Sequence, residues 1–390
     1  MNYILFDSFG RDSLMPLVCT RPVADIRVGI LTIREKWEIL LKSTTSSLTQ
    51  PHLSKKFPLK KEKDNLLING SVFPTPELVA RIDKLKSGEI LVRDDIILAM
   101  HVEESQISDF ASQEIEDTIP YTNPITKLNE TWEVFSLNPQ AILDDFELLT
   151  KGRKSQPLSK NNFVTGDPAL IFLEEGARVE FAFLNTTDGP IYVGKDAEIM
   201  EGSKVRGPMA LCAHAQLKMD AKIYGGTTVG PYSKVGGEVS NSVIMGYSNK
   251  GHDGFLGNSV LGEWCNLGAD TNTSNLKNTY DIVRLWSYDK ETFVNTGLQF
   301  CGLIMGDHSK SGINTMFNTG TVVGVSCNLY GSGFQRNFVP SFSWGGPSGM
   351  KSFNFNKAVQ VAEAVYKRRG KVFDEVDKEI FEYLYNNKSE

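Results

Sequence analysis

Aliphatic side chains recur at every sixth position through the middle of this chain, from Val193 to Val235 without an insertion. The members of this series are Val193, Ile199, Val205, Leu211, Leu217, Ile223, Val229 and Val235. Six is three times the two-residue period of a strand, so equivalent side chains keep to one face of extended backbone. Small side chains such as Ala197 and Ala221 fill most of the places two residues before the next aliphatic. The pattern predicts a three-sided parallel β-solenoid of about 18 residues per coil, because an antiparallel sandwich would not hold one register for so long.

The same period returns further along the chain and sets the expected extent of the solenoid. It continues, with one five-residue step, at Leu256, Leu261 and Leu267. It then keeps six throughout at Met305, Ser311, Phe317, Val323 and Leu329. Residues 273–303 break the pattern and are predicted to form an excursion. Since Leu173 and Val179 fit the period upstream, the solenoid is predicted to span residues 165–335.

The segments on either side of the solenoid lack the repeat. In residues 1–150 the pattern predicts strands at 3–6, 66–68 and within 89–100, a helix at 32–42, and a solvated Lys/Ser/Thr-rich loop at 42–64. Strands that alternate with helices favour an α/β domain. Residues 350–390 contain two amphipathic segments, at 356–369 and 374–386, which are predicted to be helices that close the open end of the solenoid as a cap.

Composition excludes several classes of protein. The net charge of −6 argues against a general nucleic-acid or anionic-membrane binder, because both depend on positive fields. No apolar run approaches the roughly 18 residues of a membrane span, and the first residues lack the pattern of a signal peptide. The five cysteines form no CxxC pair, so neither a zinc site nor a disulfide framework is indicated. We therefore expect a cytoplasmic protein with reduced thiols.

Two segments resemble a known family of transferases. Residues 250–269, with their five-residue step, resemble the signature coil of the bifunctional enzymes that acetylate glucosamine-1-phosphate and then uridylylate it. Residues 16–37 are similar to a divergent branch of sugar nucleotidyltransferases that carries such a solenoid. The resemblance implies a Rossmann-type nucleotidyltransferase-like α/β domain followed by a left-handed parallel β-helix of hexapeptide repeats. It also implies a homotrimer whose acyltransferase site lies between neighbouring subunits.

The resemblance assigns roles to residues of the solenoid half. It implies that His252 is the general base of acetyl transfer from acetyl-CoA, and an imidazole with an ordinary pKa of about 6.5 can take a proton from an amino sugar at neutral pH. A surface or structural histidine is the alternative reading. The positions expected to contact sugar or acyl-CoA are Asn266, Ala269 and Asn275.

A basic cluster ends the first C-terminal helix. The cluster, which consists of Lys367, Arg368 and Arg369, could bind phosphates of coenzyme A or of a nucleotide. Alternatively, these side chains only complement the dipole at the C-terminal end of the helix.

The chain also departs from this family. Where the family has Leu-Arg-Pro-Gly, with the arginine on the sugar phosphate, this sequence reads Val235-Gly236-Gly237, which leaves the acetyl acceptor open. Asn69-Gly70-Ser71 replaces a motif that holds a metal-binding aspartate, so a ligand for Mg²⁺ is lost and magnesium stays only a possible cofactor of the nucleotidyl half. The candidate nucleotide or phosphate contacts are Gly10, Arg11, Arg21, Arg27, Asn69 and Gly70.

Three functions follow from these observations. The first is acetyl transfer from acetyl-CoA to an amino-sugar phosphate by His252, joined to a nucleotidyltransferase-like domain of weak activity. The second is sugar-1-phosphate nucleotidylyl transfer alone, with the β-helix as a trimerising scaffold. The third is a non-catalytic trimer that binds a sugar nucleotide. The expected small-molecule partners are a sugar phosphate and a nucleoside triphosphate or nucleotide sugar.

Overall fold

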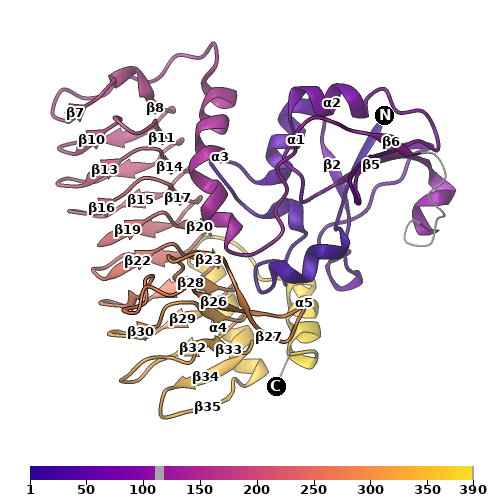
Figure 1. Ribbon diagram of the computed structural model, residues 1–390. Helices are drawn as coiled ribbons and strands as arrows, with labels where there is room; N and C mark the ends of the chain where they lie inside the picture. The colour runs from indigo at the N-terminus through magenta and orange to yellow at the C-terminus, as the bar shows by residue number, and fades with distance from the viewer. Residues whose placement is uncertain (110–117, 389–390) are drawn as a thin grey trace. The chain divides into compact units, whose positions relative to one another are not determined.

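The computed structural model describes residues 1–109 and 118–388, which form two compact units. The first unit comprises Met1–Leu14, Thr20–Ile26 and Leu31–Asn129. The second comprises Met15–Cys19, Arg27–Ile30 and Glu130–Glu390, so two short N-terminal segments belong to the same unit as the solenoid. Figure 1 gives the element labels used below. In the part of the chain that is described, no helix is both long enough and apolar enough to span a bilayer.

A mixed six-stranded sheet forms the centre of the first unit. Its order is β2-β1-β3-β5-β4-β6. The strands are β1 (Asn2–Phe6), β2 (Thr45–Leu48), β3 (Asp64–Asn69), β4 (Ile90–Arg93), β5 (Ile96–Glu103) and β6 (Thr118–Pro120). β1 runs parallel to both β2 and β3, and β5 runs antiparallel to β3. This arrangement confirms the predicted α/β domain and places the carboxyl ends of the first three strands at one edge.

The helices of this unit begin where the sequence provides caps. In α1 (Ile33–Leu41), Thr32 and Glu35 form a reciprocal capping box, which satisfies two of the amides left free at a helix start. In α2 (Pro76–Ile82), the Thr75 hydroxyl accepts from the Leu78 amide. The helix predicted at 32–42 is therefore confirmed.

The prediction of a solvated loop over residues 42–64 is wrong in part. β2 pairs with β1 in this segment, and Ser46, Ser47 and Leu53 are buried. Hydroxyl side chains occupy most of β2, so the strand carries no apolar alternation that sequence reasoning could detect. The charged residues from Lys60 to Lys63 are exposed, as expected of a solvated loop.

The second unit is a left-handed parallel β-helix, which confirms the parallel solenoid that the six-residue period predicted and the handedness that the resemblance implied (Figure 1). One sheet has the order β22-β19-β16-β13-β10-β7, from β22 (Phe255–Gly257), β19 (Glu238–Ser240), β16 (Lys222–Ile223), β13 (Lys204–Arg206), β10 (Phe183–Asn185) and β7 (Phe163–Thr165). The second has nine strands, β33 (Phe338–Val339), β31 (Thr321–Val323), β28 (Leu303–Met305), β23 (Val260–Glu263), β20 (Val243–Gly246), β17 (Thr227–Val229), β14 (Met209–Leu211), β11 (Ile191–Val193) and β8 (Ile171–Leu173). The third has ten, β35 (Gly349–Ser352), β34 (Ser343–Gly346), β32 (Asn328–Leu329), β29 (Lys310–Ser311), β24 (Asn266–Leu267), β21 (Asn249–Lys250), β18 (Lys234–Val235), β15 (Gln216–Leu217), β12 (Glu198–Ile199) and β9 (Arg178–Val179).

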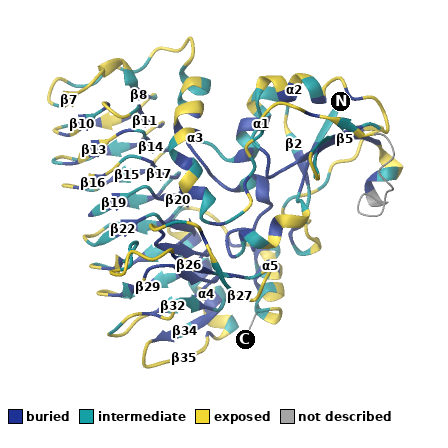
Figure 2. Cartoon of the chain, in the orientation of Figure 1, coloured by how far each residue is buried: buried dark blue, intermediate teal, exposed yellow. Residues whose placement is uncertain are grey.

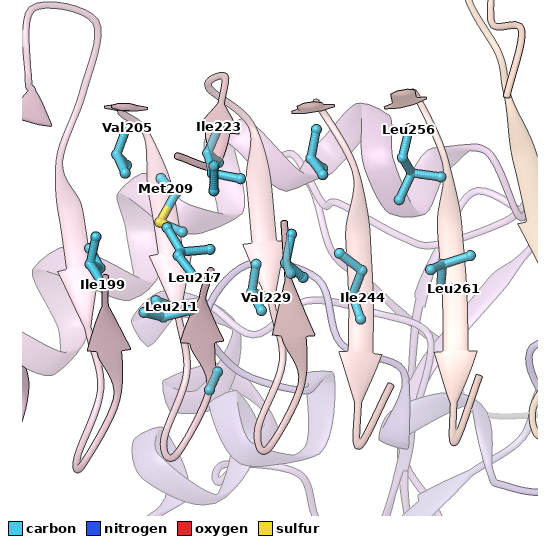
Figure 3. Packing of buried hydrophobic residues seen from close by; sticks show 14 of the residues in the cluster. Ile199, Val205, Met209, Leu211, Leu217, Ile223, Val229, Ile244, Leu256 and Leu261 are labelled. Carbon is cyan, nitrogen blue, oxygen red and sulfur yellow. The ribbon is translucent and has the colours of Figure 1, made fainter. Parts of the chain in front are cut away.

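The predicted aliphatic series fills the inside of this solenoid. All eight residues from Val193 to Val235 are buried in one continuous cluster. Strand pairing places Leu211 opposite Val229 and Leu217 opposite Val235, so each side chain stacks on its equivalent in the next coil. Figure 3 shows members of the series such as Leu211, Leu217 and Val229 pointing into the coil, and Figure 2 shows the buried residues along the strands. Burial of this stack is the main source of stability of the unit.

The break in the period at residues 273–303 is an excursion, as predicted. It contains the antiparallel hairpin of β26 (Arg284–Ser287) and β27 (Thr292–Asn295). The solenoid resumes at β28, which pairs with β23 across this insertion. A small two-stranded sheet, β25 (Asn272–Thr273) with β30 (Met316–Phe317), also connects the coils before and after the hairpin.

A column of stacked rings occupies one corner of successive coils. His214, Tyr232, Tyr247, Trp264 and His308 all have positive φ there, between 52° and 63°. Neighbouring ring centroids lie 4.6, 5.0, 4.3 and 6.2 Å apart in this order, with nearly parallel planes. Left-handed backbone at a residue other than glycine costs about 1 kcal/mol or more. Ring stacking, which contributes about 0.5–1.5 kcal/mol per pair, offsets this cost.

Two C-terminal helices pack against this aromatic column. They are α4 (Phe355–Lys367), capped by Asn354, and α5 (Glu375–Asn386), capped by Asp374, and they confirm both predicted helices. Tyr366 of α4 stacks on Trp264 with ring centroids 4.1 Å apart. The helices thus cover the side of several coils, while β35 pairs antiparallel with β34, which is itself parallel to β32.

The helix α3 (Glu133–Thr150) also packs on the solenoid. Its Asn138 side chain donates to the Gly226 carbonyl and to Thr228 Oγ1, at 2.8 and 3.0 Å. The same amide oxygen accepts from the Gly29 backbone, 2.6 Å away, and Asp145 accepts from the Ile30 backbone. Buried polar groups are costly unless paired, so these bonds fix the Arg27–Ile30 segment and α3 to the coils.

We expect Leu211→Ala to lower the free energy of unfolding by about 2–5 kcal/mol, because Leu211 is fully buried in the stack and its truncation leaves a cavity. Met219→Ala is the control, since Met219 is 66% exposed and its loss should cost less than about 0.5 kcal/mol. Urea unfolding followed by circular dichroism measures both. Equal effects of the two substitutions would contradict the stacked core.

Candidate functional site

The second unit contains a cavity of about 660 Å³ on the outer face of its ten-stranded sheet. Residues of α4 and of the turn that follows it form one wall, through Val365, Arg368 and Arg369. The other polar side chains that line it are Lys218, Lys234, Asn249, His252, Asn266 and Lys310. The cavity therefore brings together side chains that are up to about 150 residues apart in the sequence.

Strand register explains why these side chains meet. Lys234 pairs with Asn249, Asn249 with Asn266, and Asn266 with Lys310. Each stands one residue before the inward position of its strand, so all four point outward in one column. In the neighbouring column, which also contains Lys218, glycines such as Gly251 and Gly268 leave the backbone bare. The floor of the cavity is thus a strip of amides between two lysines, next to bare backbone.

Positive charge dominates the cavity. Its described lining contains five Lys and Arg side chains and no carboxylate. Burial lowers the pKa of Lys234 from its ordinary value, and the charges of Arg369, Lys218 and Arg368 lower it further. Burial and the charge of Arg368 likewise lower the pKa of Arg369, which donates to Asn249 Oδ1 at 3.2 Å. Clustered cations that repel one another in this way bind a ligand with several negative charges.

Lys310 is the cation at the end of this floor opposite Lys234. Its Nζ donates to the His308 carbonyl at 2.8 Å, which directs the ammonium along the sheet. Loss of hydration lowers the pKa of Lys310 to about 8, against a small opposite effect of Cys265. The side chain is therefore charged at neutral pH but close enough to neutrality for its charge to depend on a bound anion.

His252 lies in the corner between β21 and β22, with Gly251 before it. Its side chain is exposed and borders the cavity. The His252 carbonyl accepts a hydrogen bond from Lys250 Nζ at 2.8 Å. An exposed imidazole beside a cationic cavity is free to reach a substrate that binds there.

The structure brings together most of the residues predicted for this half. His252, Asn266, Ala269, Arg368 and Arg369 all line the cavity. The other two predicted residues are outside the lining. Asn275 donates to Asn258 Oδ1 at 2.9 Å, and Lys367 is an exposed side chain.

Sequence reasoning missed the three lysines that line the cavity. Lys234 and Lys310 each precede an inward residue of the six-residue series, and Lys218 follows one. A search for basic residues at these flanking positions would have found them, because the strand alternation places both neighbours of an inward residue on the outer face.

The first unit presents its own candidate residues at the carboxyl ends of β1 and β3. These strands are neighbours, while β2 lies on the other side of β1, so the strand order changes direction between them. Ligands of α/β sheets bind at such a point. Asn69 ends β3, and the Gly70 amide donates to the Phe6 carbonyl at 2.9 Å.

Internal contacts already use the polar groups at this edge. Asp7, which the sequence analysis did not select, accepts from the Val23 amide at 2.8 Å, from Thr49 Oγ1 at 2.6 Å and from Arg11 Nε at 3.2 Å. Burial is the largest influence on the Asp7 carboxyl and raises its pKa, although these three contacts oppose it. Arg11 is therefore held in a buried ion pair rather than presented to a phosphate.

The remaining candidates of the nucleotide site are also dispersed. Asn69 Oδ1 accepts from the amide and hydroxyl of Ser71, and its Nδ2 donates to the Ile97 carbonyl. Arg21 is buried and Gly10 is exposed. Arg27 belongs to the second unit, where its guanidinium donates to the Ile30 carbonyl.

These residues do not fit a magnesium ion. The hydroxyl of Ser71 stands where the family motif has its metal-binding carboxylate, and the Asp7 carboxylate is occupied by three donors. Magnesium prefers carboxylates that are free to coordinate it in an octahedral arrangement. We therefore assign no metal-dependent step to this edge.

Comparison with known proteins places these features in a family context. Residues 3–154 match the family model for sugar nucleotidyl transferases. The chain is 26% identical over 238 residues to the bifunctional protein GlmU of Methanocaldococcus jannaschii, an alignment that covers 58% of this chain and 51% of that protein. It is 28% identical over 144 residues to the bifunctional sugar-1-phosphate nucleotidylyltransferase/acetyltransferase of Sulfurisphaera tokodaii, which covers 36% of this chain and 35% of that one.

A bacterial relative gives a similar result. Identity to the bifunctional protein GlmU of Synechococcus elongatus is 21% over 249 residues, covering 58% of this chain and 51% of the relative. The chain thus spans about half the length of the GlmU proteins of M. jannaschii and S. elongatus. The comparisons support the resemblance seen in the sequence: residues 3–154 match the sugar nucleotidyl transferase model, and the chain is similar, at low identity, to GlmU-like bifunctional proteins.

We expect the cavity to bind inorganic pyrophosphate more weakly as the pH rises through 8, because Lys310 then loses its proton and one charged contact is lost. Between pH 7 and pH 9 the Kd should rise by on the order of tenfold, the equivalent of one charge-assisted hydrogen bond. Calorimetry in buffers of different ionisation enthalpy should show proton uptake on binding near pH 8. In Lys310→Met the rise of Kd with pH should be smaller. A wild-type Kd that does not change between pH 7 and pH 9 would contradict this account.

Proposed function

We propose that this protein transfers an acetyl group from acetyl-CoA to the amino group of an amino-sugar phosphate, with His252 as the general base. The observation that carries the proposal is the cavity in which His252 lies beside five cations and two amides. The cations suit two phosphorylated substrates, and the imidazole suits an amine that must lose a proton. The resemblance to bifunctional acetyltransferases supports the same assignment.

The chemistry needs one proton acceptor and no covalent intermediate. The His252 imidazole removes a proton from the substrate nitrogen as this nitrogen attacks the thioester carbonyl carbon. A C–N bond forms, the C–S bond breaks, and the coenzyme A thiolate leaves. The imidazolium then returns its proton to the thiolate or to solvent. Asn249 and Asn266 offer amide groups along the floor that can hold substrate hydroxyls or carbonyls.

The basic residues divide naturally between two groups of phosphates. Lys218, Lys234, Arg368 and Arg369 form one cluster, since their charges influence one another. Lys310 provides a separate cation further along the same column. In this proposal, the cluster binds coenzyme A phosphates and Lys310 binds the acceptor phosphate. Lys310 thereby replaces the family arginine, whose place Gly236 takes in this chain.

We expect His252→Ala to lower kcat for acetyl transfer by about 10²- to 10⁴-fold, the usual contribution of a positioned general base. The KM for acetyl-CoA should change little, because the cations that bind it remain. Release of free coenzyme A, followed with a thiol reagent across a panel of amino-sugar phosphates, measures the effect. His214→Ala is the matched control, since His214 is half exposed but lies outside the cavity lining. Unchanged turnover in His252→Ala would remove the base from the mechanism.

Nucleotidylyl transfer by the first unit is the second candidate. The match of residues 3–154 to sugar nucleotidyl transferases favours it, as does the change in strand order beside β1. Asp7 is paired with Arg11 and Asn69 is bonded to Ser71, so these groups are not available to a substrate, which argues against efficient catalysis. Pyrophosphate release from nucleoside triphosphates supplied with sugar-1-phosphates and Mg²⁺ tests it. Nucleotide-sugar binding without turnover in either assay would instead support the non-catalytic alternative.

We further propose a homotrimer in the cytoplasm. All five cysteines are buried free thiols, which agrees with a reducing compartment. The first coils also expose aromatic side chains, such as Phe163 at 65% and Phe181 at 55%, which a subunit interface would cover. Sedimentation equilibrium should therefore give about three times the chain mass of 43.3 kDa. A monomer with full acetyl-transfer activity would contradict a shared site.

A further inference from the structure

A lysine occupies the interior of the β-helix directly beneath His252. Lys250 pairs with Val235 in the strand register and therefore takes an inward position of the core series. It is 2% exposed and is among the largest fully buried side chains in the described chain. An apolar residue would satisfy this position by packing alone, so the presence of an ammonium requires an explanation of its own.

A shortened corner creates room for this ammonium. Successive inward residues are six apart from Leu217 to Ile223, but only four apart from Val235 to Val239. The two-residue deficit falls at Gly236 and Gly237, where φ of Gly237 is +68°. A side chain at Gly237 would come within 2.8 Å of both Lys250 Nζ and the His252 carbonyl. The corner thus draws two coils together, and their carbonyls face the interior.

Lys250 bonds these carbonyls across the coils. Its Nζ donates to the Gly236 carbonyl at 2.9 Å and to the His252 carbonyl at 2.8 Å. Burial lowers the pKa of Lys250 to about 8, while the charges of Asp253 and Asp270 oppose this shift. The amine is therefore protonated at neutral pH, and its charge strengthens both hydrogen bonds.

The start of the His252 corner is permissive, whereas its end is held by the Asp253 and Gly254 carbonyls, which accept from the Asp270 and Glu238 amides. Glycines stand at positions 251 and 254, and Gly254 has φ of +115°. A Cβ at Gly251 would meet nothing within 4 Å, so packing does not fix the start of the corner. Lys250 Nζ bonds the carbonyl of His252 itself, and this bond limits the directions in which the imidazole can point.

We propose that Lys250 is a positioning residue for His252, which holds the backbone of this histidine from inside the solenoid so that its imidazole faces the cavity. The proposal rests on the proposed function insofar as it concerns catalysis. The effect on the backbone does not depend on that function and can be measured separately.

The test compares Lys250→Met with the wild type. Methionine has about the length of lysine and is apolar like the other inward side chains, but it cannot donate to the two carbonyls. We expect kcat for acetyl transfer to fall by on the order of 10²-fold through misplacement of the base. The KM for acetyl-CoA should stay within about twofold, because Lys250 is outside the cavity lining. Hydrogen exchange of the peptide that covers residues 251–254 should accelerate by on the order of tenfold.

Two further variants make the result interpretable. Leu217→Met is the control, because it places methionine at an inward position of the same sheet without touching the His252 corner. Its kcat and its exchange at 251–254 should match the wild type. Lys250→Gln retains a donor and should give values between those of the wild type and Lys250→Met. This variant also provides the test if Lys250→Met does not fold.

The outcomes separate this proposal from the proposed function. If the wild type transfers no acetyl group, the proposed function is overturned. Faster hydrogen exchange at residues 251–254 in Lys250→Met would in that case still support the role of Lys250 in holding the backbone. Wild-type exchange and wild-type kcat in a folded Lys250→Met would overturn the positioning role, whatever the wild type catalyses. Equal losses in Leu217→Met would also overturn it, since they would reduce the effect to general disturbance of the core.

Discussion

Stacking of equivalent aliphatic side chains along the inside of the coils is the constraint on which the rest of this structure depends. Parallel strands pair at a constant offset along most of the solenoid, as Leu211 does with Val229, and the hydrophobic effect penalises any slip in this register. The register also aligns what lies outside. Because side chains alternate across a strand, the residue before each inward position joins a column, and Lys234, Asn249, Asn266 and Lys310 form the floor of the cavity in this way.

The sequence predicted those parts of the fold that burial makes periodic. The solenoid, its excursion and the helices α4 and α5 each leave a regular apolar signal. β2 leaves none, because hydroxyl side chains fill its pairing positions beside β1, and so it was mistaken for solvated loop. The cavity shows the same division. The resemblance pointed to His252 and Asn266, which line the cavity, but the floor lysines occupy outward positions where packing imposes no residue type, so neither period nor spacing distinguished them from solvated lysines.

The two units differ in how they use their charged groups. In the first, Asp7 and Arg11 form an ion pair whose side chains are each 4% exposed. A phosphate would have to compete with this pair, which is already desolvated. In the second, the charges of Arg369, Lys218 and Arg368 lower the pKa of Lys234, and the described lining residues include no carboxylate. An incoming anion relieves this repulsion instead of breaking a bond. Electrostatics thus favours ligand binding in the solenoid, even though the family match covers residues 3–154.

Loss of the family arginine and burial of Lys250 are consequences of the same change in the chain. Val235-Gly236-Gly237 replaces Leu-Arg-Pro-Gly, and the corner up to Val239 is two residues shorter than its neighbours. Shortening removes the side chain that would have reached outward to a phosphate and turns the Gly236 carbonyl inward, where an unpaired acceptor would be costly. An inward lysine satisfies that carbonyl, and its second bond falls on His252 because Gly237 lets the coils approach. Under the proposed function, the outer face then needs another cation for an acceptor phosphate, and Lys310, in the same sheet, is available on the cavity floor.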